Sequence, residues 1–273
     1  MTSDKHHNLD RTTSDHTGIK GLFERSLRRY KVAVHILTIL PLYFVCCIIL
    51  GLGLFPAVVL VQATLRGSAH LPELVQTFAL AVSLPLGYLA YGMTMIFLVP
   101  FVNFAGQFYL KPWRGSYYSA PAVTWYIHNA LTYLLRFTFL EFITPTPILN
   151  LFFVMMGMKI GDGVVINSTY FSDPSLITIG NKVTIGGSAT IVGHYGQGGF
   201  LVLAPVIIGD RATIGLKASI MGGVTIGADA KILPHTIVLP KTVIPAGETW
   251  GGVPARKISI DDLKQGKGSA VPA

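Results

Sequence analysis

The sequence predicts a left-handed parallel β-helix preceded by an α-helical transmembrane hairpin and an interfacial helix. Two observations carry this prediction: a six-residue repeat in the C-terminal part and two long uncharged runs in the N-terminal part. An α-helix repeats every 3.6 residues and a flat strand every two, so neither explains a period of six. Coils of three short strands do explain it, because stacked coils bury one aliphatic residue at each step.

The repeat is regular over the last third of the chain. Its aliphatic series is Ile208, Ile214, Ile220, Ile226, Ile232, Val238 and Ile244, and the next step falls on Trp250. Small or β-branched residues follow four places after each, namely Ala212, Ala218, Val224, Ala230, Thr236 and Thr242. The aliphatic residues are therefore predicted to point into a triangular prism.

Two breaks interrupt the repeat, and breaks in a strict pattern are where function tends to be found. The first is a slip of one residue around Ser172-Asp173-Pro174. The second lies between Ile191 and Ile208, which are 17 residues apart, one short of three full steps. The intervening segment 194–200 is rich in glycine, and we expect a loop extruded from one corner with His194 at its head.

The two uncharged runs predict the transmembrane hairpin. Hydrophobic residues make up 51% of the chain, charged residues 12%, and the mean hydropathy is +0.55. Neither 32–65 nor 74–110 contains Asp, Glu, Lys or Arg. A membrane span needs about 20 apolar residues, so each run is predicted to cross once. The sequence predicts kinks or helix ends at four prolines in these runs, Pro41, Pro56, Pro85 and Pro100.

The net charge of +8 predicts the orientation. Basic residues cluster before the first run and after the second: Arg25, Arg28, Arg29, Lys31, Lys111 and Arg114. The positive-inside rule then places the N-terminus and the β-helix in the cytoplasm, in an integral protein of the bacterial inner (plasma) membrane. The basic charge suits anionic lipid headgroups. No nucleic-acid partner is predicted, because aromatic and basic residues do not interleave.

The sequence divides into five segments. They are a disordered and basic N-terminal segment (1–31), the hairpin (32–110), an interfacial helical linker (111–157), the β-helix (158–258) and a mobile tail (259–273). Within the linker, polar residues four apart predict one stripe on an apolar helix, facing protein or water: Thr124, His128, Thr132 and Arg136. The segment 144–147 (Thr-Pro-Thr-Pro) is expected to end that helix.

His194 is the main candidate for chemistry. With about 18 residues per coil, Asp173 is expected one coil below it and near the same corner. A carboxylate there would hold the imidazole tautomer and stabilise its protonated form, as a general base requires. The spacing also allows a surface histidine beside an unrelated aspartate. His235 is expected to be an ordinary turn residue, and His128 is open between packing or headgroup contact and a role toward the acceptor.

Three segments carry a resemblance to a known family. They are 191–194 (Ile-Val-Gly-His), 206–215 and the closing stretch 250–258 with its Gly-Val-Pro-Ala-Arg motif. Over 158–258 the chain resembles the bacterial hexapeptide-repeat acyltransferases, here of a membrane-anchored type. The stretch 152–161 also resembles the membrane-linked β-helix units that end certain poly-lysine synthetases and polysaccharide acetyltransferases.

The resemblance implies chemistry, a co-substrate and an assembly. His194 would be the general base that deprotonates an acceptor hydroxyl or amine for attack on acyl-CoA, with Asp173 as its partner. The family forms homotrimers, with active sites between neighbouring prisms. By analogy the CoA contacts would be Gly215, Ala218 and Gly222 for the pantetheine arm, Lys217, Lys241, Arg256 and Lys257 for the phosphates, and Trp250 for the adenine. No metal is expected.

The leading interpretation is an acyltransferase, most simply an O-acetyltransferase, acting on a glycolipid, a lipid-linked sugar or another membrane-associated acceptor. The alternative is a non-catalytic trimeric membrane scaffold or lipid-binding protein. A γ-type carbonic anhydrase, which shares the β-helix, needs three histidines on zinc. Only His194 and His235 lie in this domain, which argues against it. The soluble sugar acetyltransferases carry a helical cap where this chain has membrane helices, and no acceptor motif matches.

Overall fold

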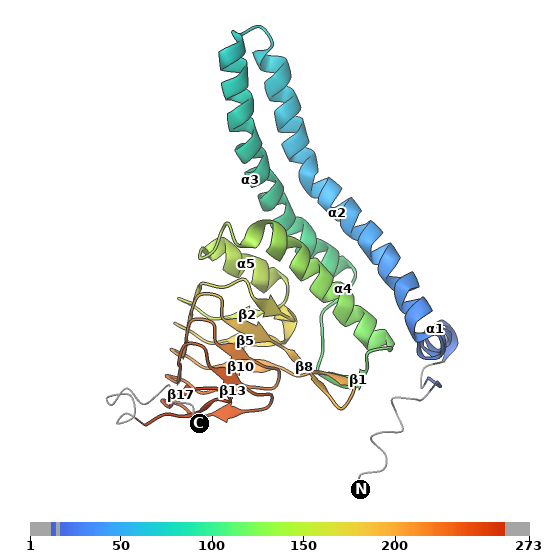
Figure 1. The fold of residues 1–273 in the computed structure, drawn as a ribbon, viewed down its shortest axis with the longest axis vertical. Coiled ribbons are helices and arrows are strands. Elements are labelled where there is room, and N and C mark those ends of the chain that lie inside the picture. Colours follow the sequence, from blue (N-terminus) through green and yellow to red (C-terminus); the bar gives the residue numbers. More distant parts are fainter. Residues whose placement is uncertain (1–11, 15–16, 260–273) are drawn as a thin grey trace.

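A computed structural model describes residues 12–14 and 17–259, and Figure 1 shows its arrangement. A long helical hairpin rises from one end of a β-helix, and shorter helices lie between the two. A short basic helix, α1 (Gly18–Arg29), lies beside the base of the hairpin. Residues 1–11 and 15–16 of the predicted disordered N-terminal segment and 260–273 of the predicted mobile tail lie outside the described residues.

Each uncharged run forms one helix, α2 (Lys31–Ser68) and α3 (Glu73–Ala105). All four prolines lie inside these helices, so of the two predicted alternatives, kinks or helix ends, none of them marks a helix end. Proline removes one backbone hydrogen bond locally, and long apolar helices tolerate that loss.

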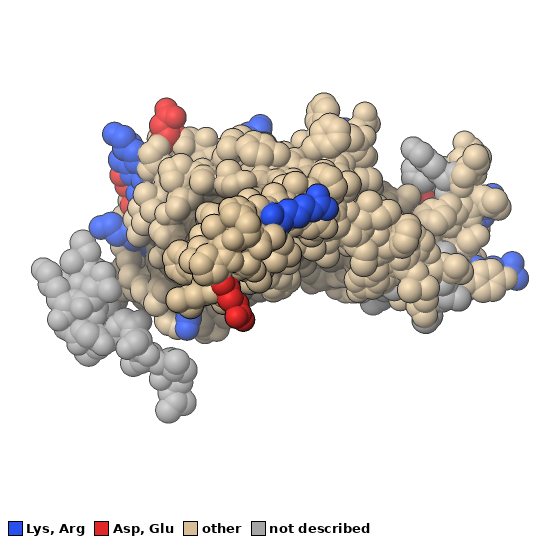
Figure 2. All heavy atoms as spheres, turned by 90° about the horizontal axis from the view of Figure 1, so that it is seen from above, with Lys and Arg blue, Asp and Glu red and all other residues tan. Residues whose placement is uncertain are grey.

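Two segments are long and apolar enough to cross a membrane, Ile39–Ser68 and Glu73–Ala105. Many of their large apolar side chains are exposed, among them Phe55 at 67% and Phe78 at 70%. Figure 2, seen from the hairpin end, shows a mostly tan surface, with most of the charged side chains near its edges. Such an exposed apolar surface is unusual for a chain surrounded by water.

The linker is more divided than the sequence predicts. It contains a strand, β1 (Trp113–Ser116), then α4 (Ala120–Leu135), a π-helical turn (Arg136–Leu140) and α5 (Pro147–Met155). The predicted single helix therefore stops before the 144–147 segment, and Pro147 begins a second helix. Proline suits the first turn of a helix, because its fixed φ is already helical and its missing N–H would have no partner there.

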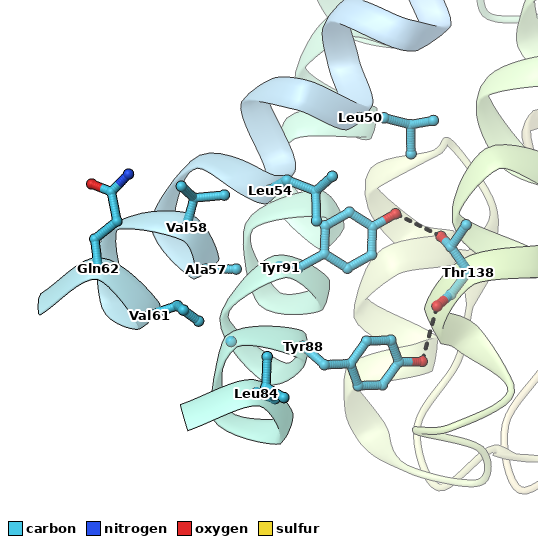
Figure 3. A pocket seen from close by; sticks show the side chains of 11 residues that line it. Leu50, Leu54, Ala57, Val58, Val61, Gln62, Leu84, Tyr88, Tyr91 and Thr138 are labelled. Carbon is cyan, nitrogen blue, oxygen red and sulfur yellow. Dashed lines mark hydrogen bonds between the residues drawn. The ribbon is translucent and has the colours of Figure 1, made fainter. Parts of the chain in front are cut away.

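The π-helical turn is fastened to the hairpin. The Tyr88 hydroxyl donates to the Thr138 carbonyl at 2.9 Å, and the Tyr91 hydroxyl donates to Thr138 Oγ1 at 2.8 Å. These three residues line an apolar cavity of about 660 Å³, together with side chains of α2 (Figure 3). The linker is thus packed onto the hairpin rather than hanging from it.

The C-terminal part is the predicted left-handed parallel β-helix, and this prediction is confirmed. One sheet contains β2 (Lys159–Ile160), β5 (Ile177–Ile179), β10 (Val206–Ile208), β13 (Thr225–Ile226) and β16 (Val243–Ile244). A second contains β3 (Val165–Ile166), β6 (Thr184–Ile185), β11 (Thr213–Ile214), β14 (Lys231–Ile232), β17 (Thr249–Gly251) and β18 (Arg256–Lys257). The third contains β4 (Phe171–Ser172), β7 (Thr190–Val192), β12 (Ser219–Ile220) and β15 (Ile237–Val238).

The register stacks the repeat on itself. Ile208 lies beside Ile226, and Ile226 beside Ile244, one coil apart. The predicted aliphatic series from 208 to 244 is at most 2% exposed, which makes it the core of the prism. Its burial supplies the driving force of the fold, at about 1.5–3 kcal/mol for each large aliphatic side chain.

Candidate active site

The second break in the repeat folds as a β-hairpin, so the expected irregular loop was wrong. Strands β8 (His194–Gln197) and β9 (Phe200–Leu203) pair antiparallel, and β9 also pairs with β1 of the linker. Gly198 and Gly199 form the turn with φ of +57° and +78°, as a tight hairpin turn requires. The glycines supply that turn, and the four apolar residues after them form a buried strand.

Two glycines let neighbouring coils close on His194. A Cβ on Gly193 would lie 2.9 Å from Leu176 Cβ and 3.1 Å from Asp173 Cβ. A Cβ on Gly222 would lie 2.9 Å from the His194 backbone nitrogen. Any larger residue would push the hairpin away from the coils on either side. At this corner the backbones of neighbouring coils therefore lie so close together that both positions require glycine.

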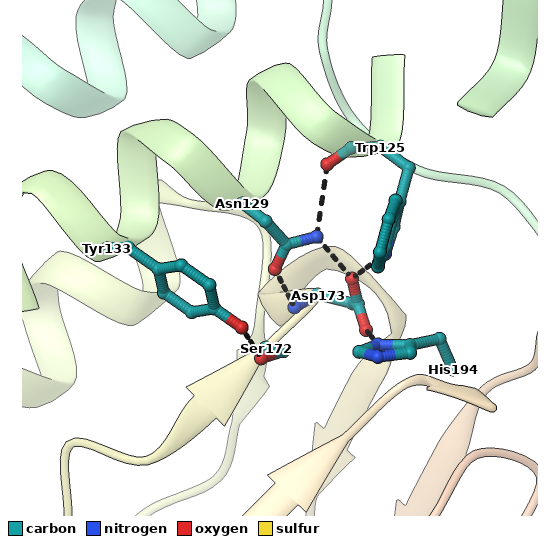
Figure 4. A network of polar contacts seen from close by, with 6 residues as sticks. All are labelled: Trp125, Asn129, Tyr133, Ser172, Asp173 and His194. Carbon is teal, nitrogen blue, oxygen red and sulfur yellow. Dashed lines mark hydrogen bonds and ion pairs between the residues drawn. The ribbon is translucent and has the colours of Figure 1, made fainter. Parts of the chain in front are cut away.

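His194 and Asp173 form a hydrogen-bonded pair (Figure 4). His194 Nδ1 lies 2.5 Å from Asp173 Oδ2; the aspartate side chain is fully buried and the imidazole is 24% exposed. An ionised carboxylate only accepts hydrogen bonds, so Nδ1 carries the proton in this pair. The lone pair of the neutral imidazole is then on Nε2, which is the arrangement a general base needs.

Helix α4 holds the other side of the aspartate. Trp125 Nε1 donates to Asp173 Oδ1 at 2.8 Å, and Asn129 Nδ2 donates to the same oxygen at 2.7 Å. The Asp173 backbone N–H donates to Asn129 Oδ1 at 3.4 Å, from a residue with φ of +62°. Both carboxylate oxygens are thus bound, which compensates for burying the charge and fixes its direction.

Sequence reasoning missed these α4 residues. Trp125, Asn129 and Tyr133 are four apart and form a stripe one residue along from the predicted one. Tyr133 extends the contact, with its hydroxyl 2.5 Å from Ser172 Oγ. The Trp125 ring also meets the imidazole of His194 edge-on, with centroids 5.0 Å apart. The four-residue spacing could have identified this stripe, but two neighbouring stripes on the same helix both show that spacing.

The predicted stripe on α4 turns mainly toward protein. His128 and Thr132 are fully buried, and His128 Nδ1 lies 2.8 Å from Asn103 Oδ1 on α3. Burial lowers the pKa of His128 to about 4, so its imidazole is neutral at physiological pH. This contact to α3 is a packing arrangement, one of the two roles left open by the sequence.

The predicted CoA residues lie on different parts of the prism. Gly222 and Lys241 share the corner of His194, whereas Gly215, Lys217 and Ala218 lie at the corner between β11 and β12. His235 lies one coil further at that second corner, exposed and with φ of +57°. A step of six residues turns the chain by one third of a coil, so residues on successive steps face different sides.

The remaining CoA candidates lie where the β-helix ends. Glu248 Oε1 accepts from Lys257 Nζ at 2.6 Å, and Glu248 Oε2 accepts from Trp250 Nε1 at 2.8 Å. The Lys257 bond, followed by that of Trp250, lowers the pKa of the Glu248 carboxyl. Arg256 pairs with Gly251 in the closing turn. Within the described residues of one chain, this group does not meet His194. Nor do those residues contain a cluster of three His, Cys, Asp or Glu side chains suited to a metal.

The chain is similar to known proteins over part of its length. No family model matches the chain. The delta-poly-L-ornithine synthetase of Acinetobacter baumannii (strain AB307-0294) is 30% identical over 120 residues, which are 44% of this chain. The chain spans only 9% of the length of that relative.

The chain is also similar to several solved structures over part of its length. A hexapeptide-repeat-containing acetyltransferase from Vibrio cholerae is 30% identical, covering 38% of this chain and 62% of that one, with a TM-score of 0.35. The same acetyltransferase complexed with acetyl coenzyme A, from Vibrio cholerae O1 biovar eltor, is 29% identical over 38% of this chain and 60% of that one, with a TM-score of 0.35. A maltose O-acetyltransferase from Clostridium difficile 630 is 20% identical over 55% and 93% of the two chains, with a TM-score of 0.41.

The sequence repeat, the register that stacks it and the buried aliphatic series define the same unit. Residues 159–258 are therefore a β-helix built from hexapeptide repeats, as the sequence predicts.

Proposed function

We propose that the protein is a membrane-anchored, CoA-dependent acyltransferase that moves an acetyl or longer acyl group to a hydroxyl or amine. The acceptor is a membrane-associated molecule such as a glycolipid or a lipid-linked sugar. The observation that carries the proposal is the 2.5 Å contact between His194 Nδ1 and a fully buried Asp173. A histidine in a merely structural turn has no need of a buried carboxylate held by two further donors.

In this mechanism Nε2 of His194 takes the proton of the acceptor hydroxyl or amine. The acceptor oxygen or nitrogen attacks the thioester carbonyl carbon of acyl-CoA, and the carbon–sulfur bond breaks. The sulfur leaves as the CoA thiol after receiving the proton from Nε2. Asp173 stabilises the imidazolium that forms between the two proton transfers, and Trp125 and Asn129 keep the carboxylate aimed at Nδ1.

Acyl-CoA is the proposed co-substrate, bound between two prisms of a homotrimer. The separation of the candidate residues over two corners and one end supports a shared site. Gly222 and Lys241 are beside the base of the same chain. The others would then face a neighbouring base: Gly215, Lys217, Ala218, Trp250, Arg256 and Lys257.

Helices α2 and α3 are proposed to anchor the protein in the bacterial inner membrane, with the β-helix in the cytoplasm. Their apolar side chains are widely exposed, and the connector between them holds few charges. Basic residues lie at the opposite end of the hairpin, which is the expected cytoplasmic side. Acyl-CoA is available in that compartment.

The experiment is release of CoA thiol from acetyl-CoA by the detergent-solubilised full chain with a total membrane-lipid extract. We expect lipid-dependent release that His194→Ala lowers by about 10²–10⁴-fold, the usual contribution of a general base. His70→Ala is the control, because it removes an exposed histidine of the connector between α2 and α3, outside the β-helix. Equal rates for wild type and His194→Ala would overturn the assignment of the base. A protein that neither releases thiol nor binds acetyl-CoA would instead be a lipid-binding scaffold.

A further inference from the structure

A second cavity, of about 510 Å³, adjoins the hairpin that carries His194. It is enclosed by α1, the segment 107–113, the first turn of α4 and strand β9. Its wall is mostly aromatic and aliphatic with a few polar groups, and includes Phe23, Gln107, Lys111, Trp113, Thr124 and Leu203. Ligand sites in proteins have this composition: apolar walls that bury the ligand and a few polar groups that orient it.

The strand register places this cavity next to the catalytic candidate. Leu203 lies directly opposite His194 across β8 and β9, and directly opposite Trp113 across β9 and β1. Side chains at opposite positions of antiparallel strands share one face of the sheet, with Cβ atoms about 5 Å apart. The imidazole and the cavity wall are therefore on the same face, one strand apart.

Lys111 gives the cavity its charge. It is the one ionised side chain in the lining, it is exposed, and among the described residues no carboxylate lies within ion-pair distance of it. A cation without a counterion, set in a mainly apolar wall, favours an anionic ligand with an apolar part.

Helix α1 connects the cavity with the membrane surface. Its apolar residues Ile19 and Leu22 are 87% and 62% exposed, and Phe23 reaches the cavity lining. Arg25 and Arg29 are exposed on the same short helix. A helix of this kind lies in the interface, with its apolar side chains among the acyl chains and its cations at the headgroups. A lipid in that leaflet thus borders the cavity directly.

We propose that this cavity binds the phosphate-bearing head group of an anionic amphipathic acceptor and presents the acceptor's hydroxyl or amine to His194 Nε2. Lys111 meets the phosphate, and Phe23 and Trp113 contact the adjoining apolar part. The proposal deepens the proposed acyl transfer and rests on it for the reaction, but the binding step is measurable without any turnover.

The binding test uses the fluorescence of Trp113 in the detergent-solubilised full chain. The probes are dihexanoyl phosphatidic acid below its micelle concentration, dihexanoyl phosphatidylcholine and inorganic phosphate. We expect saturable binding of phosphatidic acid, at least tenfold weaker binding of the other two, and loss of the signal in Trp113→Phe. Lys111→Gln should weaken phosphatidic acid binding about tenfold, Lys111→Arg should restore it, and Lys159→Gln, another exposed lysine, should leave it unchanged.

Kinetics separates this site from the reaction. In the thiol-release assay, with dihexanoyl phosphatidylglycerol, whose head group has free hydroxyls, or the lipid extract as acceptor, Lys111→Gln should raise the KM for acceptor about tenfold. The KM for acetyl-CoA and kcat should stay within a factor of two. Equal binding of the zwitterionic and anionic probes, or binding indifferent to Lys111→Gln, would overturn the cavity assignment even if His194-dependent transfer persists. Lys111-dependent binding without any transfer would support the site and refute the acyltransferase.

Discussion

The regular coils and the broken corner of the β-helix are built by opposite rules. In the coils, each aliphatic residue packs on its counterpart one coil away, as Ile208 does on Ile226. At the corner of His194, the partners come from far along the chain: Asp173 from the coil below, and Trp125 and Asn129 from the linker helix. The comparison teaches that repetition supplies stability, whereas chemistry depends on contacts that the repeat does not contain.

The substitution Asp173→Asn should have the largest effect on activity while leaving the regular coils intact. The new amide directs an N–H toward His194 Nδ1, which favours the tautomer with its proton on Nε2, and that nitrogen then cannot take the acceptor proton. We expect kcat to fall by about 10²–10⁴-fold. Circular dichroism and acetyl-CoA binding should remain close to wild type. A rate within threefold of wild type would show that the pair is not used in catalysis.

Ile226→Ala is the converse change, made in a regular coil. It leaves a cavity in the prism core and should lower the free energy of unfolding by about 2–5 kcal/mol. The residue is 1% exposed and stacks between Ile208 and Ile244. Activity per folded molecule should be unchanged, as measured below the unfolding transition. A loss of kcat as large as that of Asp173→Asn would mean that the coils and the corner are not separable.

The buried His128, where α4 packs against α3, makes the stability of the protein depend on pH. Its pKa is lowered to about 4 by burial, against an ordinary value near 6.5, so the unfolded chain binds a proton that the folded chain refuses. The contribution of His128 to the free energy of unfolding should therefore decrease as pH falls from about 6.5 to 4, by up to roughly 3 kcal/mol, and stay constant below that range.

The comparison with His128→Gln isolates this effect. The variant retains a buried polar side chain that cannot titrate, and both proteins share every carboxylate. As pH falls from about 6.5 to 4, the free energy of unfolding of the wild-type protein should therefore decrease more than that of the variant. Parallel stability curves from pH 7 to pH 4 would contradict a neutral buried imidazole. Asp173, Asn103 and the Phe108 backbone are the groups acting on or contacting His128, and both proteins contain them.

The sequence was sufficient wherever a local period decides the structure. A strict step of six can bury its aliphatic residues only in a triangular coil, and runs without charge can form only long apolar helices. The same reasoning brought Asp173 near His194, because coil length fixes which residues stack. It did not separate the two polar stripes on α4, since each has the four-residue spacing of a helix face.

The tertiary structure alone decided what surrounds the pair. The pairing of β1 with β9 joins residues about ninety positions apart, and the hydrogen bonds from α4 to Asp173 span more than forty. No local pattern encodes such contacts, because they depend on where a helix lands after the chain has packed. The sequence by itself determined the prism and the two long apolar helices before it. The direction of the Asp173 carboxylate, the hairpin that carries His194 and the cavity beside it were fixed by packing between the two.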